Sequence, residues 1–273
     1  MRIGVLGAGN MGGAIVRGYA KASIGRDGSP RILVFDTDGT KLRALGQCSG
    51  VREATDLRDL IEGSEILIIA LKPNAFDAAM PQIAACADQS KTKTDRVFVS
   101  IAAGVSIAYL KGFLGRERKV VRAMPNTPAT VGEGMTALAR DDKVTDGEYA
   151  AVCRIFESVG RIASVDEVML DAVTGVSGSS PAYAYMYMQA LIECAVENGL
   201  GESEARLLAA QATLGAARMV LAGEESPERL RINVCSPGGT TVEAVRVLED
   251  RKFMDAVKEA MNAAVAKSKR MTR

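Results

Sequence analysis

The chain has 273 residues, enough for one large domain or two ordinary ones. Its net charge is +1, so the chain as a whole offers no basic field for nucleic acid or anionic lipid, and we expect neither as a partner. The absence of histidine excludes Ser-His-Asp hydrolysis, His-ligated metal sites and dehydrogenases with a histidine acid. The five cysteines are widely spaced and odd in number, so we expect neither a disulfide framework nor a zinc site.

Apolar runs in the sequence are short. The first residues lack the long apolar region of a signal peptide. The longest apolar run, Ile66 to Leu71, is too short to cross a bilayer. We therefore expect a cytoplasmic protein without a membrane partner.

The first 165 residues alternate short apolar runs with amphipathic stretches. Strands are predicted at Arg2–Leu6, Arg31–Phe35, Glu65–Leu71, Arg96–Ile101 and Lys119–Ala123, with weaker strands at Met135–Ala139 and Arg161–Val165. Helices are predicted at Met11–Ala22, around Thr40–Leu45 and near Ala75–Ala85. This rhythm predicts a Rossmann-like α/β fold, a doubly wound sheet of mainly parallel strands with helices on both faces.

The pattern changes after about residue 165, where helical spacing replaces the strands. Helices are predicted at Pro181–Asn198, Ser203–Ala222, Pro227–Ile232, Thr241–Glu249 and Lys252–Lys269. Ser180 and Pro181 suit the start of the first of these helices. We therefore predict a dinucleotide-binding domain at residues 1–165 and an all-helical domain at residues 166–273.

The first predicted turn carries the pattern GxGxxG, from Gly7 to Gly12, between a strand and a helix. Gly7 permits a tight turn, Gly9 lets the backbone approach a pyrophosphate, and Gly12 lets the helix pack close to the strand. The helix then offers its unpaired N–H groups to the phosphates. The pattern predicts a dinucleotide site rather than a glycine-rich turn without a ligand.

Further candidate cofactor residues follow later strands. Asp36 ends the second strand, where a carboxylate can accept hydrogen bonds from ribose hydroxyls and repel a 2′-phosphate; a turn-forming aspartate is nearly as good an interpretation. Lys72, after the strand at Glu65–Leu71, is either a cofactor-facing cation or a solvated surface lysine. The small residues at Ile101–Gly104 leave room for a flat nicotinamide, or for tight packing at a strand end.

Three later segments suggest a second ligand. Met124–Pro128 forms a loop stiffened by two prolines, and Ser177–Tyr183 precedes a helix. In Asn233–Thr241, glycines free the backbone just before another helix starts, which makes a nest for a small carboxylate. An N-cap with a glycine turn is the alternative interpretation of that last segment.

These motifs together resemble the pyrroline-5-carboxylate reductase family over nearly the whole chain. GAGNMG, ALKP, IAAG, MPNTP, SGSSPAY and SPGGTT occur in the order and spacing of that family, and SPGGTT is the most specific of them. One position departs, because the family usually has a glycine where this chain has Ser180. The resemblance implies reduction of 1-pyrroline-5-carboxylate to proline, with NADPH or NADH as cofactor. It also implies a homodimer through the C-terminal helices, with a decamer as a further assembly.

The resemblance also implies the site residues. The cofactor site comprises Gly7, Ala8, Gly9, Asn10, Met11, Gly12, Asp36, Ala70, Leu71, Lys72, Pro73, Ile101, Ala102 and Ala103. The substrate site comprises Glu224, Asn233, Ser236, Gly239, Thr240 and Thr241.

The implied reaction fits a chain without histidine. A protonated cyclic imine is already a good electrophile, so orientation and a hydrogen bond suffice. We expect Thr241 to contact the ring nitrogen, Ser236 to hold the carboxylate and Lys72 to supply electrostatic bias.

Two other functions are less consistent with the sequence. β-Hydroxyacid dehydrogenases and related imine reductases usually need a helical lysine as acid, and no lysine occurs between Lys143 and Lys252. A non-catalytic NAD(P)-binding redox sensor would need the glycine loop but has no reason to contain SPGGTT.

Overall fold

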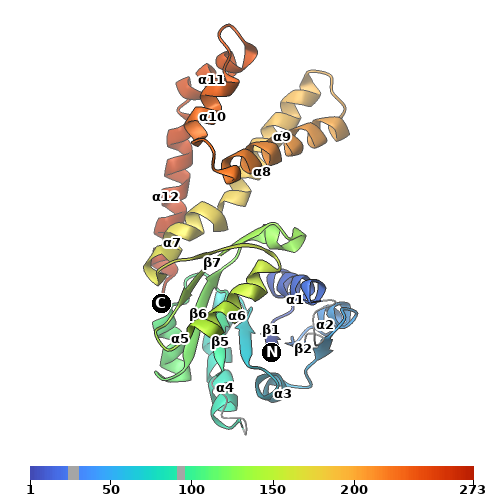
Figure 1. Ribbon diagram of the computed structural model, residues 1–273, viewed down its shortest axis with the longest axis vertical. Helices are drawn as coiled ribbons and strands as arrows, with labels where there is room; N and C mark the ends of the chain where they lie inside the picture. The colour runs from blue at the N-terminus through green and yellow to red at the C-terminus, as the bar shows by residue number, and fades with distance from the viewer. Residues whose placement is uncertain (24–30, 91–95) are drawn as a thin grey trace. The chain divides into compact units, whose positions relative to one another are not determined.

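The protein is described here by a computed structural model, which covers residues 1–23, 31–90 and 96–273. The chain divides into two compact units (Figure 1). The sheet unit comprises residues 1–179 together with 264–273, and the helical unit comprises residues 180–263.

An eight-stranded sheet forms the centre of the sheet unit in the described residues, with the strand order β3-β2-β1-β4-β5-β6-β7-β8. The strands are β1 (Arg2–Leu6), β2 (Arg31–Phe35), β3 (Val51–Glu53), β4 (Ile66–Ile69), β5 (Val97–Ser100), β6 (Lys119–Met124), β7 (Gly134–Arg140) and β8 (Gly160–Ser164). All neighbouring strands are parallel except β6 and β7, which are antiparallel. Together with the helices that follow, this arrangement confirms the predicted fold class.

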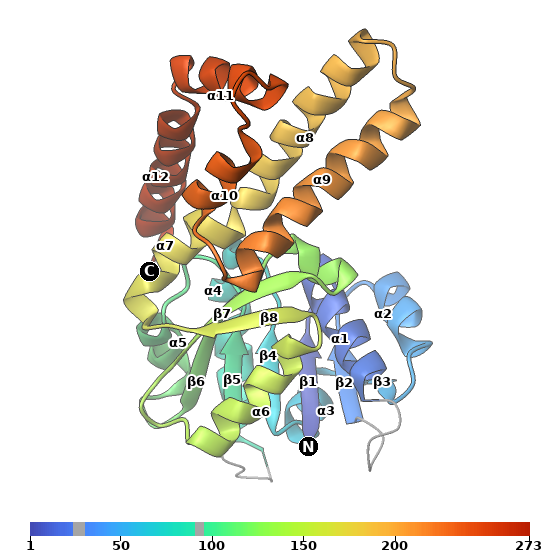
Figure 2. The ribbon, with the colours of Figure 1, turned by 45° about the horizontal axis from the view of Figure 1, so that its top comes forward.

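Helices cover both faces of the sheet, and Figure 2 shows the sheet between them. They are α1 (Asn10–Ala22), α2 (Gly39–Gly46), α3 (Leu57–Glu62), α4 (Phe76–Asp88), α5 (Ile107–Leu114) and α6 (Asp146–Glu157), with short 3-10 turns at η1 (Pro73–Ala75) and η2 (Thr127–Val131). One core cluster joins α1 and α6 to one face, and the other joins α3, α4 and α5 to the opposite face. Because both faces are covered, β4 is apolar and buried along its whole length.

The sheet unit extends past the predicted boundary at residue 165. A 3-10 turn η3 (Glu167–Met169), the helix α7 (Leu170–Val173) and a π-helical turn η4 (Thr174–Gly178) follow β8. Leu170 is buried against Ala137 and Ala139 of β7. Glu167 accepts hydrogen bonds from the backbone N–H of Ile107 (2.7 Å) and from the Arg122 guanidinium (3.2 Å). These contacts keep residues 166–179 with the sheet.

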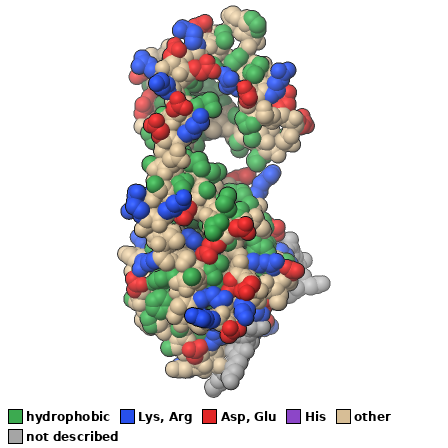
Figure 3. Space-filling view, turned by 90° about the vertical axis from the view of Figure 1, so that its left-hand side faces the viewer, with side chains coloured by type: hydrophobic (Ala, Val, Ile, Leu, Met, Phe, Trp, Pro, Cys, Tyr) green, Lys and Arg blue, Asp and Glu red, His purple; other side chains and the backbone are tan. Residues whose placement is uncertain are grey.

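The helical unit is built from α8 (Ser180–Glu197), α9 (Glu202–Ala222), α10 (Pro227–Val234), α11 (Thr240–Asp250) and the first part of α12 (Phe253–Met271). Many of its large apolar side chains are exposed, among them Tyr185, Met186, Leu191, Leu207, Leu208 and Met219. Hydrophobic side chains lie among charged ones on the face seen in Figure 3. Within the described residues, no helix has the length and apolar character needed to cross a membrane.

Candidate active site

The loops that carry the predicted cofactor residues leave the same edge of the sheet. In register, Leu6 of β1 lies beside Ile69 of β4, and Ile69 lies beside Ser100 of β5. The three parallel strands therefore end together. The chain winds outward from β1 through β2 to β3 and then returns to the other side of β1 at β4. Such a reversal of strand order is where doubly wound sheets bind ligands.

Gly7 and Gly12 of the first loop have the conformational roles predicted for them. Gly7 has a φ of +104°, and a Cβ there would lie 2.6 Å from the carbonyl oxygen of Ala70. Gly12 lies so close to the carbonyl oxygen of Gly7 that a Cβ would clash with it. A Cβ on Gly9, in contrast, would meet no heavy atom of the described residues within 4 Å. The fold therefore explains Gly7 and Gly12, and leaves space beside Gly9.

The start of α1 faces this space with its backbone donors. Gly9 is the N-cap residue, and no side chain among the described residues caps the helix. The first turn, Asn10 to Gly12, thus presents N–H groups and the positive end of the helix dipole. A pyrophosphate is the kind of group that such a turn binds. These residues fit the phosphates of a dinucleotide.

Asp36 binds the glycine loop directly. Its Oδ2 accepts a hydrogen bond from the backbone N–H of Ala8 at 2.6 Å, and its Oδ1 accepts one from Asp38 N–H at 2.8 Å. Asp38 in turn caps α2 and pairs with Lys41 at 3.2 Å. The hydrogen bonds from Lys41 and Thr40 lower the pKa of the Asp38 carboxyl. The half-buried Asp36 carboxylate is therefore part of the turn as well as a candidate ribose acceptor.

The loop after β4 presents one charged side chain. Ala70 and Leu71 pack against the two core clusters, whereas Lys72 is exposed and makes no ion pair with any described residue. Pro73 then begins η1. Lys72 is thus a cation at the ligand-binding edge of the sheet without a fixed partner in the described part of the chain.

The loop after β5 is compact. Ile101 donates its N–H to Ile69 of the neighbouring strand at 3.3 Å, which extends the sheet by one residue. Ala102 is buried, and its N–H points to the Ser100 hydroxyl at 3.3 Å. Ala103 is half-buried. Because its side chains are small, this loop packs closely against the end of the sheet.

Asn126 joins two of the segments that suggest a second ligand, MPNTP and SGSSPAY. Its side-chain Nδ2 donates to the carbonyl oxygen of Ser177 at 3.0 Å, and its Oδ1 accepts from Met135 N–H at 2.8 Å. Asn126 comes from MPNTP and Ser177 from SGSSPAY. The helix α8 starts at Ser180, within one residue of the prediction, and it follows the π-helical turn η4 and a bend at Ser179.

Within the helical unit, four of the six predicted substrate residues, Ser236, Gly239, Thr240 and Thr241, lie at or just before the start of α11. Gly238 has a φ of +71°, and the N–H of Gly239 donates to the carbonyl oxygen of Ser236 at 3.0 Å. Gly239 is the N-cap residue, and no described side chain caps α11. The first turn, with Thr240 and Thr241, presents N–H groups and hydroxyls together. This is the nest predicted for a small carboxylate.

Glu224 lies before α10, and Asn233 lies in the last turn of α10. Glu224 is exposed, and the Asn233 side chain donates to its neighbour Glu225 at 2.8 Å rather than to Glu224. The cofactor residues therefore belong to the sheet unit and the substrate residues to the helical unit. No role for Asn126 could be predicted from the sequence, although the two prolines within MPNTP indicate a fixed loop.

Family comparisons agree with both units. Residues 167–271 match the family model described as pyrroline-5-carboxylate reductase dimerisation, and residues 2–104 match that of NADP oxidoreductase, coenzyme F420-dependent. The sequence is 40% identical to the pyrroline-5-carboxylate reductase of Escherichia coli (strain K12), covering 100% of this chain and 98% of that protein. It is 35% identical to the enzyme of Arabidopsis thaliana, covering 98% and 94%.

Solved structures give the same result. The pyrroline-5-carboxylate reductase of Coxiella burnetii matches with a TM-score of 0.90 and 33% identity, covering 100% of this chain and 98% of that one. The Plasmodium falciparum pyrroline carboxylate reductase, solved with NADP bound, matches with a TM-score of 0.86 and 29% identity, covering 100% and 98%. From the glycine loop to the start of α11, this chain belongs to the pyrroline-5-carboxylate reductase family.

Proposed function

We propose that this chain reduces the C=N bond of 1-pyrroline-5-carboxylate to give proline, with NADPH or NADH as the reductant. The observation that carries the proposal is the presence of two helix starts that no described side chain caps and that differ in chemistry. One follows a glycine loop with open space at Gly9, and the other follows a glycine turn lined with hydroxyls. The first suits a pyrophosphate and the second a small carboxylate.

The cofactor residues act by binding and orientation. The N–H groups of Asn10 to Gly12 hold the pyrophosphate, and Asp36 holds both the loop and the adenosine ribose. The loops Ala70–Pro73 and Ile101–Ala103 flank the nicotinamide. When bound, the cofactor supplies a hydride to the C=N carbon, which is C2 of the pyrroline ring and becomes C5 of proline.

The substrate residues act on the other end of the ring acid. Ser236 and the N–H groups near Gly239 and Thr240 bind the carboxylate, with Glu224 and Asn233 at the rim. The Thr241 hydroxyl accepts a hydrogen bond from the protonated ring nitrogen. That nitrogen gains the C=N electron pair when hydride adds, and it keeps its proton, so no protein acid is consumed. Lys72 supplies positive charge beside the cofactor.

The described apolar surface of the helical unit supports a homo-oligomer. The family model that matches residues 167–271 is a dimerisation model. Exposed side chains such as Met186, Leu207 and Leu208 are unfavourable in water and suit a subunit interface. We propose a dimer through the C-terminal helices, and a decamer built from such dimers. Light scattering of the purified protein measures both.

We place the enzyme in the cytoplasm. All five cysteines, which lie in the described residues, are free thiols. Unpaired thiols suit a reducing compartment, which is also where reduced nicotinamide cofactors are available. Fractionation of the native host with an antibody to the chain tests this location.

The reaction itself is tested by an assay with purified protein. Oxidation of NADPH and of NADH is followed at matched concentrations, with and without 1-pyrroline-5-carboxylate, while proline is quantified. Imine-dependent oxidation with stoichiometric proline is expected with at least one cofactor. If the imine causes oxidation of neither NADPH nor NADH, the proposed function is wrong.

A further inference from the structure

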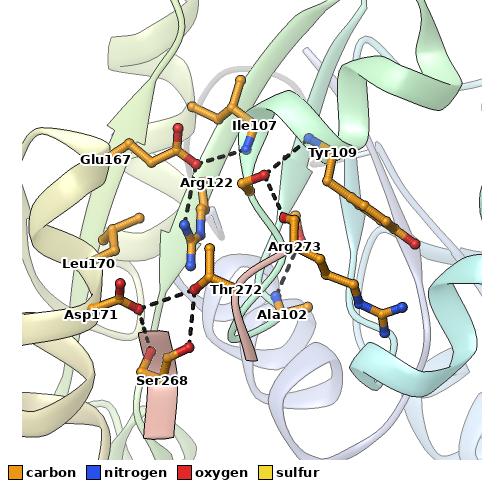
Figure 4. Close-up of polar contacts among 12 residues, drawn as sticks. Ala102, Ile107, Tyr109, Arg122, Glu167, Leu170, Asp171, Ser268, Thr272 and Arg273 are labelled. Atoms are coloured by element: carbon orange, nitrogen blue, oxygen red, sulfur yellow. Dashed lines mark hydrogen bonds and ion pairs between the residues drawn. The ribbon is translucent and has the colours of Figure 1, made fainter. Parts of the chain in front are cut away.

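The last residues of the chain, 268–273, lie beside the loop that follows β5 (Figure 4). We call these residues the clasp. The N–H of Arg273 donates to the carbonyl oxygen of Gly104 at 3.1 Å. The Arg273 carbonyl oxygen accepts hydrogen bonds from Ser106, through its N–H at 3.1 Å and its Oγ at 2.6 Å. The backbone of the clasp is therefore bonded to the loop on both sides of Val105.

A glycine makes this approach possible. Gly104 has a φ of +72°, and a Cβ there would lie 2.9 Å from the carbonyl oxygen of Met271. That distance is shorter than any ordinary carbon–oxygen contact, and the conformation is strained for other residues. The last residue of IAAG thus serves the clasp, in addition to any role of its neighbours beside a cofactor.

The Arg273 side chain reaches a second loop, the one that follows β4. Its Nη1 pairs with Asp77 Oδ2 at 2.7 Å, and its Nη2 donates to the carbonyl oxygen of Pro73 at 2.8 Å. The guanidinium also lies 5.4 Å from the ring centroid of Tyr109, whose hydroxyl donates to Asp77. The hydrogen bonds from Tyr109 and Arg273 lower the pKa of the Asp77 carboxyl, so its charged form is favoured.

The other side of the clasp is fixed to α7. Ser268, which is buried, donates its hydroxyl to Asp171 Oδ1 at 2.5 Å, and the Thr272 hydroxyl lies 3.3 Å from the same oxygen (Figure 4). The clasp is therefore anchored to the sheet unit independently of the two loops.

We propose that the clasp holds the loops after β4 and β5 at a fixed separation, and that Arg273 is a positioning residue for the cofactor. The inference rests on the proposed cofactor site, because Pro73 ends one flanking loop and Gly104 ends the other. A site that is already ordered loses less conformational entropy when its ligand binds. Arg273 contributes by bonding to both loops at once.

The first test replaces Arg273 with alanine and measures NADPH and NADH affinity directly, from the fluorescence of the bound cofactor. Affinity for both cofactors is expected to fall roughly two- to tenfold, as for loss of an exposed ion pair and a backbone hydrogen bond. KM for the imine at saturating cofactor is expected to stay near that of the unchanged protein. Arg270→Ala, three residues earlier and exposed, removes the same charge and is expected to leave cofactor affinity unchanged.

Gly104→Ala provides an independent variant, because it displaces the clasp without removing a charge. It is expected to weaken cofactor binding in the same direction as Arg273→Ala. In an Asp77→Asn background, Arg273→Ala is expected to have less effect than alone, since the two side chains act as a pair. A purely structural contribution to stability would not give this selectivity for the cofactor over the imine.

Two results would overturn the proposal. One is unchanged cofactor affinity in both Arg273→Ala and Gly104→Ala; the other is an equal loss of imine and cofactor affinity. Failure of the proposed function looks different, because the unchanged protein would then bind cofactor but convert no imine.

Discussion

The side chain of Asn126 supplies the hydrogen bond that the carbonyl oxygen of Ser177 cannot receive from its own helix. In an α-helix this oxygen would accept from the N–H of residue 181, which is a proline and has none. Asn126 Nδ2 lies 3.0 Å from the oxygen, and the π-helical turn brings Ser179 N–H to Thr174 instead, at 2.8 Å. A loop beside β6 and the turn that leads into α8 are therefore held together by one buried amide.

Replacing Asn126 with alanine is expected to lower the free energy of unfolding by about 1–3 kcal/mol. The change leaves the Ser177 carbonyl and the Met135 N–H without their partner, and unpaired buried polar groups cost about that much. Urea denaturation measures it. With Pro181→Ala as background, the loss should be smaller, because residue 181 then carries an N–H that can bond to Ser177. Equal losses in the two backgrounds would contradict this account of the proline.

Gly9→Ala is expected to separate folding from cofactor binding. A Cβ there meets no heavy atom of the described residues within 4 Å, and Gly9 has a φ of −64°, which alanine adopts freely. The melting temperature should therefore stay unchanged while cofactor affinity falls, since the methyl group occupies the space left for the pyrophosphate. Gly12→Ala is the contrasting variant and should lose stability, because its Cβ clashes with the Gly7 carbonyl. A Gly9→Ala protein with normal cofactor affinity would place the pyrophosphate elsewhere.

Asp36→Asn is expected to shift the cofactor preference toward NADPH. Asparagine keeps an oxygen that can accept from Ala8 N–H, but it removes the negative charge that repels a 2′-phosphate. The ratio of kcat/KM for NADPH over NADH should rise, and stability should fall modestly because the amide nitrogen cannot accept the hydrogen bond from Asp38 N–H. Asp38→Asn changes the same charge nearby on a side chain that already pairs with Lys41, and it serves as the control. An unchanged ratio in Asp36→Asn would mean that Asp36 serves the loop alone.

Thr241→Ala is expected to lower kcat/KM for the imine by roughly 10- to 100-fold, the size of one lost orienting hydrogen bond to a charged group. Cofactor affinity should stay near normal, because Thr241 belongs to the helical unit. Thr241→Ser retains the hydroxyl and should recover most of the rate. Full activity in Thr241→Ala would exclude this residue from the reaction.

At acid pH, protonation of the Asp59 carboxylate is expected to lower the free energy of unfolding. Its carboxylate accepts two hydrogen bonds from the Arg52 guanidinium, at 3.0 and 3.1 Å, and one from Thr55 N–H at 3.0 Å. These contacts lower its pKa below the usual value of 3.8, Arg52 contributing most. The unfolded chain then binds the proton first as pH falls, so the stability contributed by Asp59 is present above 3.8 and is lost below it.

The variant Asp59→Asn isolates this contribution. Near neutral pH its unfolding free energy should lie below that of the unchanged protein, by about 0.5–2 kcal/mol for a bidentate pair with a backbone bond. The difference should narrow as pH falls below 3.8. A difference that stays constant through that range would show that ionisation of Asp59 does not stabilise the fold.

The longer strands of the sheet and the helices α1, α2 and α4 could be predicted from the sequence, because their apolar residues follow the periods of strands and helices. The helices α3, α5 and α6 are not among the predicted elements. The strand Val51–Glu53 could not be predicted, since it contains a single apolar residue and pairs at the sheet edge with β2 alone. The sheet unit also extends to Ser179, because one buried side chain, Leu170, fixes a segment that has helical spacing.

Some features of the candidate site could be predicted from the sequence, and others could not. Glycine roles at Gly7 and Gly12 depend on local backbone geometry, so the motif alone predicts them. The hydrogen bond from Asn126 to Ser177 spans 51 positions, and that from Arg273 to Pro73 spans 200. Such long-range hydrogen bonds cannot be predicted from sequence periodicity, because they form only when the tertiary fold brings distant loops together.

The central claim is hydride transfer from nicotinamide to the C=N carbon of the substrate, which becomes C5 of proline. The most direct measurement uses cofactor carrying deuterium at the transferable C4 position and analyses the product by mass spectrometry and NMR. The account predicts proline with a single deuterium at C5, formed in proportion to the cofactor oxidised. Unlabelled proline, or cofactor oxidation without proline, would contradict it.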